Sequence, residues 1–190
     1  MHCDHTSVGF LHSLQRHSDG AWSRLNDIYT PLIRKWLRQY GTSESDADDI
    51  SQDVILVVFR RLADFERERP GSFRCWLRRI TVNCLRDNRR KSAKQVVGEG
   101  VSELVKGLED PDSDLSRRWN VEHDIHVLRF VMREVKESFS DQTWQAFQRT
   151  ALAGQQPGKV ALDLGVSENA VCIAKSRVSA RIRAAAKGLL

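Results

Sequence analysis

The C-terminal part of the sequence combines a tight turn with a row of cationic side chains. A short apolar segment, 159–164, is followed by Gly165-Val166-Ser167, in which glycine can adopt a positive φ and serine can cap a helix. The next segment, 168–187, carries the basic side chains Lys175, Arg177, Arg181 and Arg183. A short helix, a turn and a basic second helix predict a helix-turn-helix, whose second helix enters the major groove of DNA. A helical hairpin in an unrelated bundle is the alternative interpretation.

A second group of residues, between 72 and 94, places cations beside aromatic rings. Its basic side chains are Arg74, Arg78, Arg79, Arg86, Arg89, Arg90 and Lys91. Phe73 and Trp76 accompany them. Cations that bind phosphates and rings that stack on bases suit single-stranded DNA. Two other interpretations stay open, because the rings lie on the apolar stripe of the predicted helix and surface arginines are often merely solvated.

A third group is acidic and lies at the start of a predicted helix. It comprises Asp46, Asp48, Asp49, Gln52 and Asp53. Carboxylates at a helix N-terminus interact favourably with the helix dipole, which alone could explain the first of them. Asp49, Gln52 and Asp53 share one helix face, so they could also form a docking surface for a basic partner.

The sequence offers little to an enzyme. It has no phosphate-binding glycine loop, no ligand spacing typical of a metal site and no recognisable Ser–His or Cys–His arrangement, so we expect no catalytic residues, no metal and no cofactor. Cys75, Cys84 and Cys172 fall in helical patterns, where we expect small buried apolar residues. Without a signal peptide or an apolar run of about 20 residues, we expect a cytoplasmic protein with no membrane insertion.

The elements that position these groups are all predicted to be helices, because apolar residues recur every three or four positions. Helical patterns cover about 20–40, 45–62 and 72–92, and they resume at about 125. Residues 60–94 hold twelve Lys or Arg against four Asp or Glu, whereas residues 95–124 hold three against eight. We therefore expect an all-α chain of two small helical domains, 1–94 and 122–190, joined by a flexible acidic linker over 95–121.

Taken in order, these segments resemble the sigma factors of bacterial RNA polymerase. Residues 46–54, DADDISQDV, resemble the family's D-A-x-D-x-x-Q-[ED]-V/A motif. Residues 73–83, FRCWLRRITVN, resemble F-R-x-W-L-x-R-I-A-x-N and lead into an Arg-Arg-Lys run. The resemblance covers the family's second region over about 20–92 and its fourth region over about 125–188. With no third region between them, the chain is similar to the compact extracytoplasmic-function group.

The resemblance implies a role for each group of residues. Asp49, Gln52 and Asp53 match the face that binds a coiled coil of the largest polymerase subunit. The loop 66–72 and the following helix match the element that recognises the minus-ten promoter sequence, where a non-template base is flipped into a pocket at a cost of about a few kcal/mol. The implied minus-ten residues are Phe73, Arg74, Trp76, Arg78, Arg79, Asn83, Asp87 and Arg90.

The second helix of the helix-turn-helix would read the minus-thirty-five element. The implied residues are Ser167, Asn169, Lys175, Ser176, Arg177 and Arg181. The chain departs from the family here, because relatives often carry Arg-Ser-Arg where it has Cys172-Ile173-Ala174. The promoter sequence therefore does not transfer from relatives.

The resemblance implies core RNA polymerase and promoter DNA as partners, an anti-sigma factor as a candidate regulator, and association with the nucleoid. It predicts a function in promoter recognition and transcription initiation. The alternative is a stand-alone dimeric helix-turn-helix regulator. That alternative explains the C-terminal half but assigns no role to 46–92.

Overall fold

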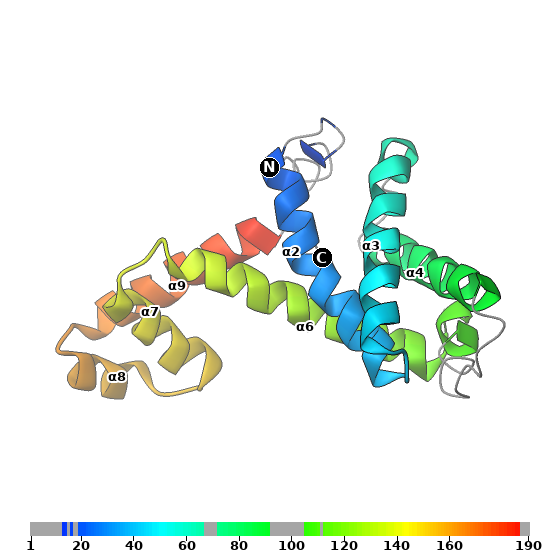
Figure 1. The fold of residues 1–190 in the computed structure, drawn as a ribbon. Helices are drawn as coiled ribbons and strands as arrows, with labels where there is room; N and C mark the ends of the chain where they lie inside the picture. The colour runs from blue at the N-terminus through cyan, green and yellow to red at the C-terminus, as the bar shows by residue number, and fades with distance from the viewer. Residues whose placement is uncertain are drawn as a thin grey trace. The chain divides into compact units, whose positions relative to one another are not determined.

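The structure is a computed structural model that describes residues 13–14, 16, 19–66, 72–91, 105–110 and 112–186. Every regular element in these residues is helical, which confirms the expected all-α class (Figure 1). The described residues form two compact units, one up to residue 127 and one from residue 128. No helix in these ranges is both long enough and apolar enough to cross a bilayer.

The first unit is built on α2 (Asp19–Gln39), α3 (Glu44–Arg61) and α4 (Ser72–Lys91), with α3 packed against both of the others (Figure 1). A short helix, η1 (Leu62–Asp64), follows α3. Each long helix buries residues at three- and four-residue spacing, as an amphipathic helix must. The fully buried side chains of these helices include Leu25, Ile28, Leu32, Ile33, Trp36, Ile50, Val54, Val58 and Leu77.

Local signals define the helix boundaries of this unit. Gly41 has a φ of 87°, a left-handed conformation that ends α2 at little cost for glycine. Ser43 caps α3, because its hydroxyl accepts a hydrogen bond from the Asp46 amide at 3.1 Å. Ser72 begins α4, as the sequence predicted.

The segment that we expected to be a flexible linker differs from that expectation wherever the structure describes it. Residues 105–109 form a helical turn, and α6 (Asp114–Lys136) begins within the expected linker. Val105, Leu108 and Trp119 are buried, the last with only 1% of its surface exposed. Trp119 packs edge-on against Trp36 at a centroid distance of 5.1 Å. The two compact units divide after residue 127.

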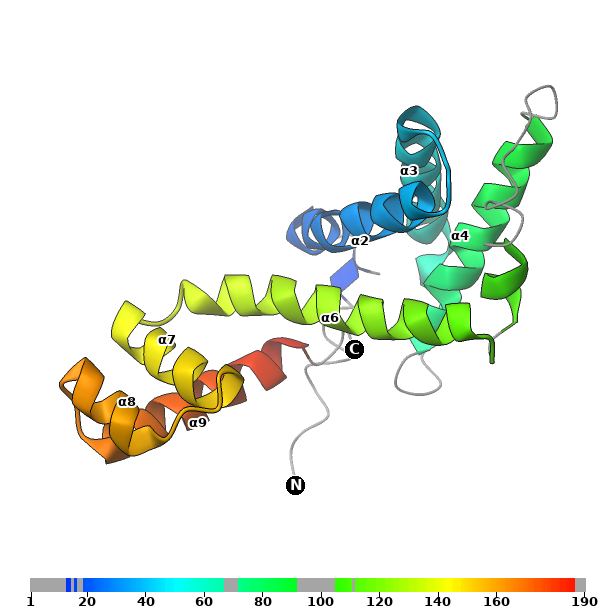
Figure 2. The same cartoon turned by 90° about the horizontal axis from the view of Figure 1, so that it is seen from below.

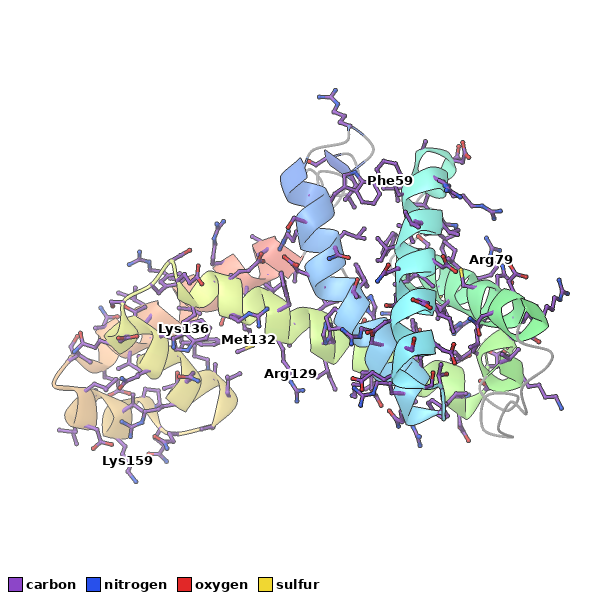
Figure 3. The ribbon with its side chains drawn as sticks, in the orientation of Figure 1. Phe59, Arg79, Arg129, Met132, Lys136 and Lys159 are labelled. Atoms are coloured by element: carbon purple, nitrogen blue, oxygen red, sulfur yellow. The ribbon has the colours of Figure 1, made fainter. Side chains whose placement is uncertain are left out.

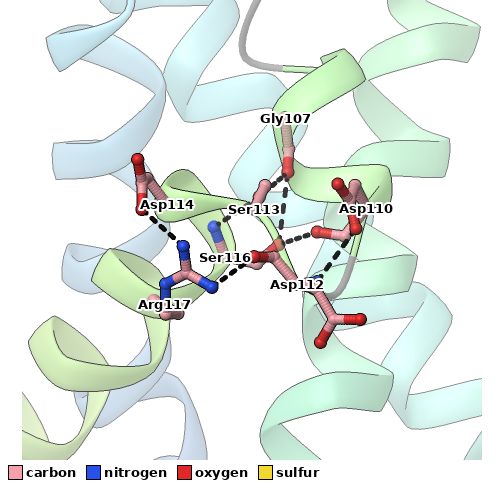
Figure 4. Close-up of polar contacts among 7 residues, drawn as sticks. All are labelled: Gly107, Asp110, Asp112, Ser113, Asp114, Ser116 and Arg117. Atoms are coloured by element: carbon pink, nitrogen blue, oxygen red, sulfur yellow. Dashed lines mark hydrogen bonds and ion pairs between the residues drawn. The ribbon is translucent and has the colours of Figure 1, made fainter.

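A hydrogen-bonded turn connects the two helical pieces of this segment (Figure 4). Ser113 caps α6 by accepting from the Ser116 amide at 3.0 Å, and it also donates to the Gly107 carbonyl oxygen. The Ser116 hydroxyl lies 2.6 Å from the Asp110 carbonyl oxygen and 3.2 Å from that of Gly107. Arg117 binds the Asp114 carboxylate at 2.6 Å. Acidic composition suggested a solvated chain, but satisfied polar groups and three buried apolar side chains give this segment a defined conformation.

The first part of α6 is a structural member of the first unit and passes along α2 (Figure 2). Lys35 of α2 forms an ion pair with Glu122 at 3.0 Å, and His126 Nε2 lies 2.7 Å from the Ile28 carbonyl oxygen. Arg74 of α4 binds Asp124. Contacts with two other helices therefore hold this part of α6 in place.

The second unit contains α7 (Asp141–Phe147), η2 (Gln148–Leu152), α8 (Pro157–Leu164) and α9 (Glu168–Ala186). Its core includes Ala146, Val160, Ala161, Val171 and Ala174. Gly165 has a φ of 65° in the turn between α8 and α9, and Ser167 caps α9 by accepting from the Ala170 amide at 3.2 Å. The predicted helix-turn-helix is thus confirmed.

Two polar contacts connect the supporting helices of the second unit to α8. Gln142 Nε2 donates to the Leu164 carbonyl oxygen at 3.1 Å, and Arg149 forms an ion pair with Asp163. The hydrogen bond from Arg149 lowers the pKa of Asp163 below its ordinary value. These contacts connect α8 to α7 and η2, and α9 packs against both α7 and α8.

Candidate nucleic-acid and polymerase surfaces

A cavity of about 720 Å³ opens along α4 and contains several of the residues predicted to bind the minus-ten element. It is lined by Asp64, Phe65, Glu66, Ser72, Cys75, Trp76, Arg78, Arg79, Val82, Asn83, Arg86, Leu108 and Glu109. One wall is aromatic, because the rings of Phe65 and Trp76 lie 4.8 Å apart. The others are mostly polar, so the cavity offers an apolar surface beside donors and acceptors.

Arg79 is an exposed side chain of α4 (Figure 3). Asn83 is exposed one helical turn further on, and both residues line this cavity. Arg78 also lines it, although only 7% of its surface is exposed. Asn83 can both donate and accept hydrogen bonds, as the recognition of a base edge requires. The structure therefore brings together Trp76, Arg78, Arg79 and Asn83, which the sequence predicted as a group.

Two predicted DNA-binding residues instead stabilise the unit. Phe73 is buried and contacts the rings of Tyr29 and Phe65 at 5.5 and 5.6 Å. Arg74 Nη1 lies 2.8 Å from each carboxylate oxygen of Asp124. Of the interpretations left open for Phe73, the structure supports the core one, because its ring is buried. The partner of Arg74, fifty positions away, could not be read from the sequence.

The remaining predicted residues of α4 lie around a second, smaller cavity of about 270 Å³. Asp87 and Arg90 line it together with Val57 and Arg61 of α3, and Asn83 borders both cavities. Arg90 Nη1 lies 3.8 Å from Asp87 Oδ1. The side chains of Arg89 and Lys91 lie outside the described residues.

The sequence did not predict that the 105–110 segment contributes to the site. Leu108 and Glu109 form part of the larger cavity, and Glu109 forms an ion pair with Arg86. The only signal in the sequence was the three-residue spacing of Val105 and Leu108, which is typical of a helix face but too short to stand out from an acidic stretch.

Two neighbours, His123 and Arg74, stabilise the ionised form of Asp124. Asp124 Oδ1 lies 2.9 Å from His123 Nδ1, and the His123 ring stacks on Tyr29 at 5.6 Å. Partial burial acts to raise the pKa of Asp124, but the hydrogen bond from His123 and the charge of Arg74 outweigh it, so the pKa falls below its ordinary value. Burial raises the pKa of the Tyr29 hydroxyl. The Asp124 carboxylate therefore binds two partners, Arg74 and His123.

The acidic residues at the start of α3 separate into two groups. The Ser43 hydroxyl donates to Asp46 at 2.7 Å, and Arg34 forms an ion pair with Asp48, so these two carboxylates have intramolecular partners. Asp49, Gln52 and Asp53 are exposed and share one face, which Leu56 extends by another turn. Helix capping accounts for Asp46 and the ion pair with Arg34 accounts for Asp48, whereas the second group is exposed to solvent.

The side of α9 that the sequence predicted to read DNA is also exposed. Its predicted residues Asn169, Lys175, Ser176, Arg177 and Arg181 all face solvent, whereas the Ser167 hydroxyl is occupied in capping α9. Cys75 and Cys172 are exposed, which corrects our expectation that they would be buried; Cys84 is half-buried. The described residues include no group of His, Cys, Asp and Glu side chains arranged to hold a metal ion.

Comparisons with known proteins find sigma factors of RNA polymerase. The family model for Sigma-70 region 2 matches residues 26–95. The RNA polymerase sigma factor NccH of Alcaligenes xylosoxydans xylosoxydans is 32% identical over 178 residues, which cover 90% of this chain and 87% of NccH. The ECF RNA polymerase sigma factor SigE of Mycolicibacterium smegmatis is 27% identical over 74 residues, which cover 39% of this chain and 28% of SigE. A solved structure of CnrH in complex with the cytosolic domain of CnrY matches with a TM-score of 0.39 and 24% identity, over 94% of this chain and 96% of that chain.

The 32% sequence identity with NccH, over 90% of this chain and 87% of NccH, shows that the chain is a sigma factor. The chain belongs to the extracytoplasmic-function sigma factors of bacterial RNA polymerase. Its function is to bind core RNA polymerase and direct it to promoters for transcription initiation. A stand-alone regulator is not favoured, because it would assign no role to the region-2 match.

Proposed function

We propose that the larger cavity on α4 receives an unstacked base of the melted non-template strand. The observation that carries this proposal is the convergence of Trp76, Arg79 and Asn83 on one cavity. An aromatic wall can stack on the base, Asn83 can hydrogen-bond its edge, and the arginines can hold its phosphates. A base that remains paired exposes no Watson–Crick edge, so such a pocket recognises sequence only after melting.

The exposed face of Asp49, Gln52 and Asp53 is the proposed docking surface for the polymerase. These side chains provide carboxylates and an amide for a basic partner, and half-exposed Leu56 supplies an apolar anchor beside them. Asp46 and Asp48 are already paired within the chain, which supports a separate purpose for the exposed group.

The helix-turn-helix of the second unit is proposed to read the minus-thirty-five element in duplex form. Asn169, Ser176 and Arg177 would face the groove, while Lys175 and Arg181 would approach the phosphates. The two units would then bind two promoter elements at once, in the nucleoid. We also propose an anti-sigma factor as a partner, because a protein that covers the α3 face would exclude the polymerase.

The experiment compares two pairs of substitutions in the full-length chain. Arg79→Ala and Asn83→Ala should leave capture of core RNA polymerase unchanged but reduce promoter opening, measured by permanganate reactivity of unpaired thymines, by roughly tenfold or more. Gln52→Ala with Asp53→Ala should abolish capture itself.

Each pair of variants is the control for the other. If Arg79→Ala or Asn83→Ala lost the polymerase, the cavity would belong to the docking surface rather than to DNA. If the double variant at 52 and 53 retained full capture, the α3 face would be an ordinary solvated helix start.

A further inference from the structure

One large apolar side chain lies in the middle of the surface that α9 presents to DNA. The opposite side of α9 is buried through Val171, Ala174, Val178 and Ile182. On the reading side, Ile173 has 48% of its surface exposed. Asn169 precedes it by four residues, and Ser176 and Arg177 follow by three and four, so polar side chains surround it on one helix face.

This position is unusual for an isoleucine. Scattered exposed apolar residues are common on protein surfaces and require no explanation. Ile173, however, lies in the N-terminal half of the recognition helix, from which helix-turn-helix proteins contact base edges. Cys172 is exposed beside it, so an apolar and a weakly polar side chain are adjacent on this surface.

The major groove contains one apolar group that such a side chain could bury. Guanine, cytosine and adenine present hydrogen-bond donors and acceptors there, whereas thymine also presents its C5-methyl group. Apolar side chains in the groove contact that methyl group. An isoleucine offers no hydrogen bond to a base edge, so the thymine methyl group is the feature of the groove that it can favour.

We propose that Ile173 contacts the C5-methyl group of a thymine in the minus-thirty-five element and thereby determines promoter specificity at that position. The inference rests on the proposed placement of α9 in the major groove. The contact involves no covalent chemistry; it selects thymine over the other bases by excluding water from two apolar groups.

The test replaces thymine by uracil, which removes only the methyl group. Holoenzyme reconstituted from the full chain and core polymerase first selects its minus-thirty-five sequence from a library of randomised duplexes. Each selected thymine is then replaced by uracil, one at a time, and the affinity is measured. We expect one replacement to weaken wild-type binding about fourfold, the ratio expected for one buried methyl group.

Two variants identify the side chain responsible. Ile173→Ala should bind the thymine and uracil duplexes equally. Leu162→Ala is the matched control, because Leu162 of α8 is even more exposed, at 85%, but does not lie on α9; it should retain the fourfold difference.

The outcomes distinguish failure of the Ile173 contact from failure of the proposed placement of α9 on DNA. If no uracil replacement affects the wild type, or if the effect persists in Ile173→Ala, the proposed methyl contact is wrong. Lys175→Ala with Arg177→Ala should lose affinity for the element whether or not it contains uracil. If this double variant binds as tightly as the wild type, the placement of α9 on DNA fails as well.

Discussion

Asp124 connects α6 to α4 through a single carboxylate that Arg74 and His123 share. Neither partner could be assigned from the sequence, because helix periodicity identifies faces but not which faces meet. Arg79 and Asn83, which the resemblance implied as minus-ten residues, are both exposed and line one cavity. The sequence left two interpretations of Phe73 open, and the structure places this side chain in the core of the first unit.

Replacing Asp124 by asparagine should destabilise the first unit by about 1 kcal/mol at pH 7. The carboxylate loses two charge-assisted partners, but 41% of its side chain is exposed, so solvent screening limits the cost. The free energy of unfolding is measured by chemical denaturation. Glu122→Gln is the control, because it breaks only the surface ion pair with Lys35 and should cost less.

The destabilisation caused by Asp124→Asn should also depend on pH. The pKa of Asp124 is lower in the folded chain than its ordinary value of 3.8, so its contribution is complete above about pH 4 and is lost as the pH falls through the folded pKa. The difference in stability between the wild type and Asp124→Asn should therefore shrink below about pH 4. A constant difference down to pH 2 would show that the carboxylate charge has no part in it.

At the scale of elements, the first half of α6 is the part that sequence patterns described least well. The helix-turn-helix was predictable because glycine, a capping serine and periodic apolar residues all lie within about thirty positions. The 105–121 segment lacked such agreement: its acidic composition indicated a linker, while its structure depends on tertiary burial of Val105, Leu108 and Trp119.

Trp119→Ala should destabilise the first unit by about 3–5 kcal/mol, because it removes a fully buried side chain that packs on Trp36. Hydrogen exchange followed by mass spectrometry would detect faster exchange in α2 and α4 and little change in α7 to α9. Val121→Ala, in the same helix but 57% exposed, should stay within about 0.5 kcal/mol of the wild type. Equal behaviour of the two variants would support a linker without tertiary contacts.

At the scale of the whole molecule, the chain consists of two units that share one continuous helix. A fragment of residues 1–127 should keep the stability of the first unit and still capture core polymerase, but it should lose dependence on the minus-thirty-five element. A fragment of residues 1–113 lacks Trp119 and Asp124 and should be less stable by at least about 3 kcal/mol. Thermal melts of the two fragments measure this difference in stability. Equal melting temperatures would show that α6 does not stabilise the first unit.

In the larger cavity, the Glu109 carboxylate forms an ion pair with Arg86. Glu109 acts as a built-in counterion, so a phosphate that binds Arg86 must displace a carboxylate tethered to the same chain. The freed carboxylate then attracts a cation from solution, which offsets the cation released from the DNA. Arg86 would thus hold the strand without steepening the dependence of binding on salt, whereas an ordinary arginine contact steepens the logarithmic slope by about 0.7 for single strands.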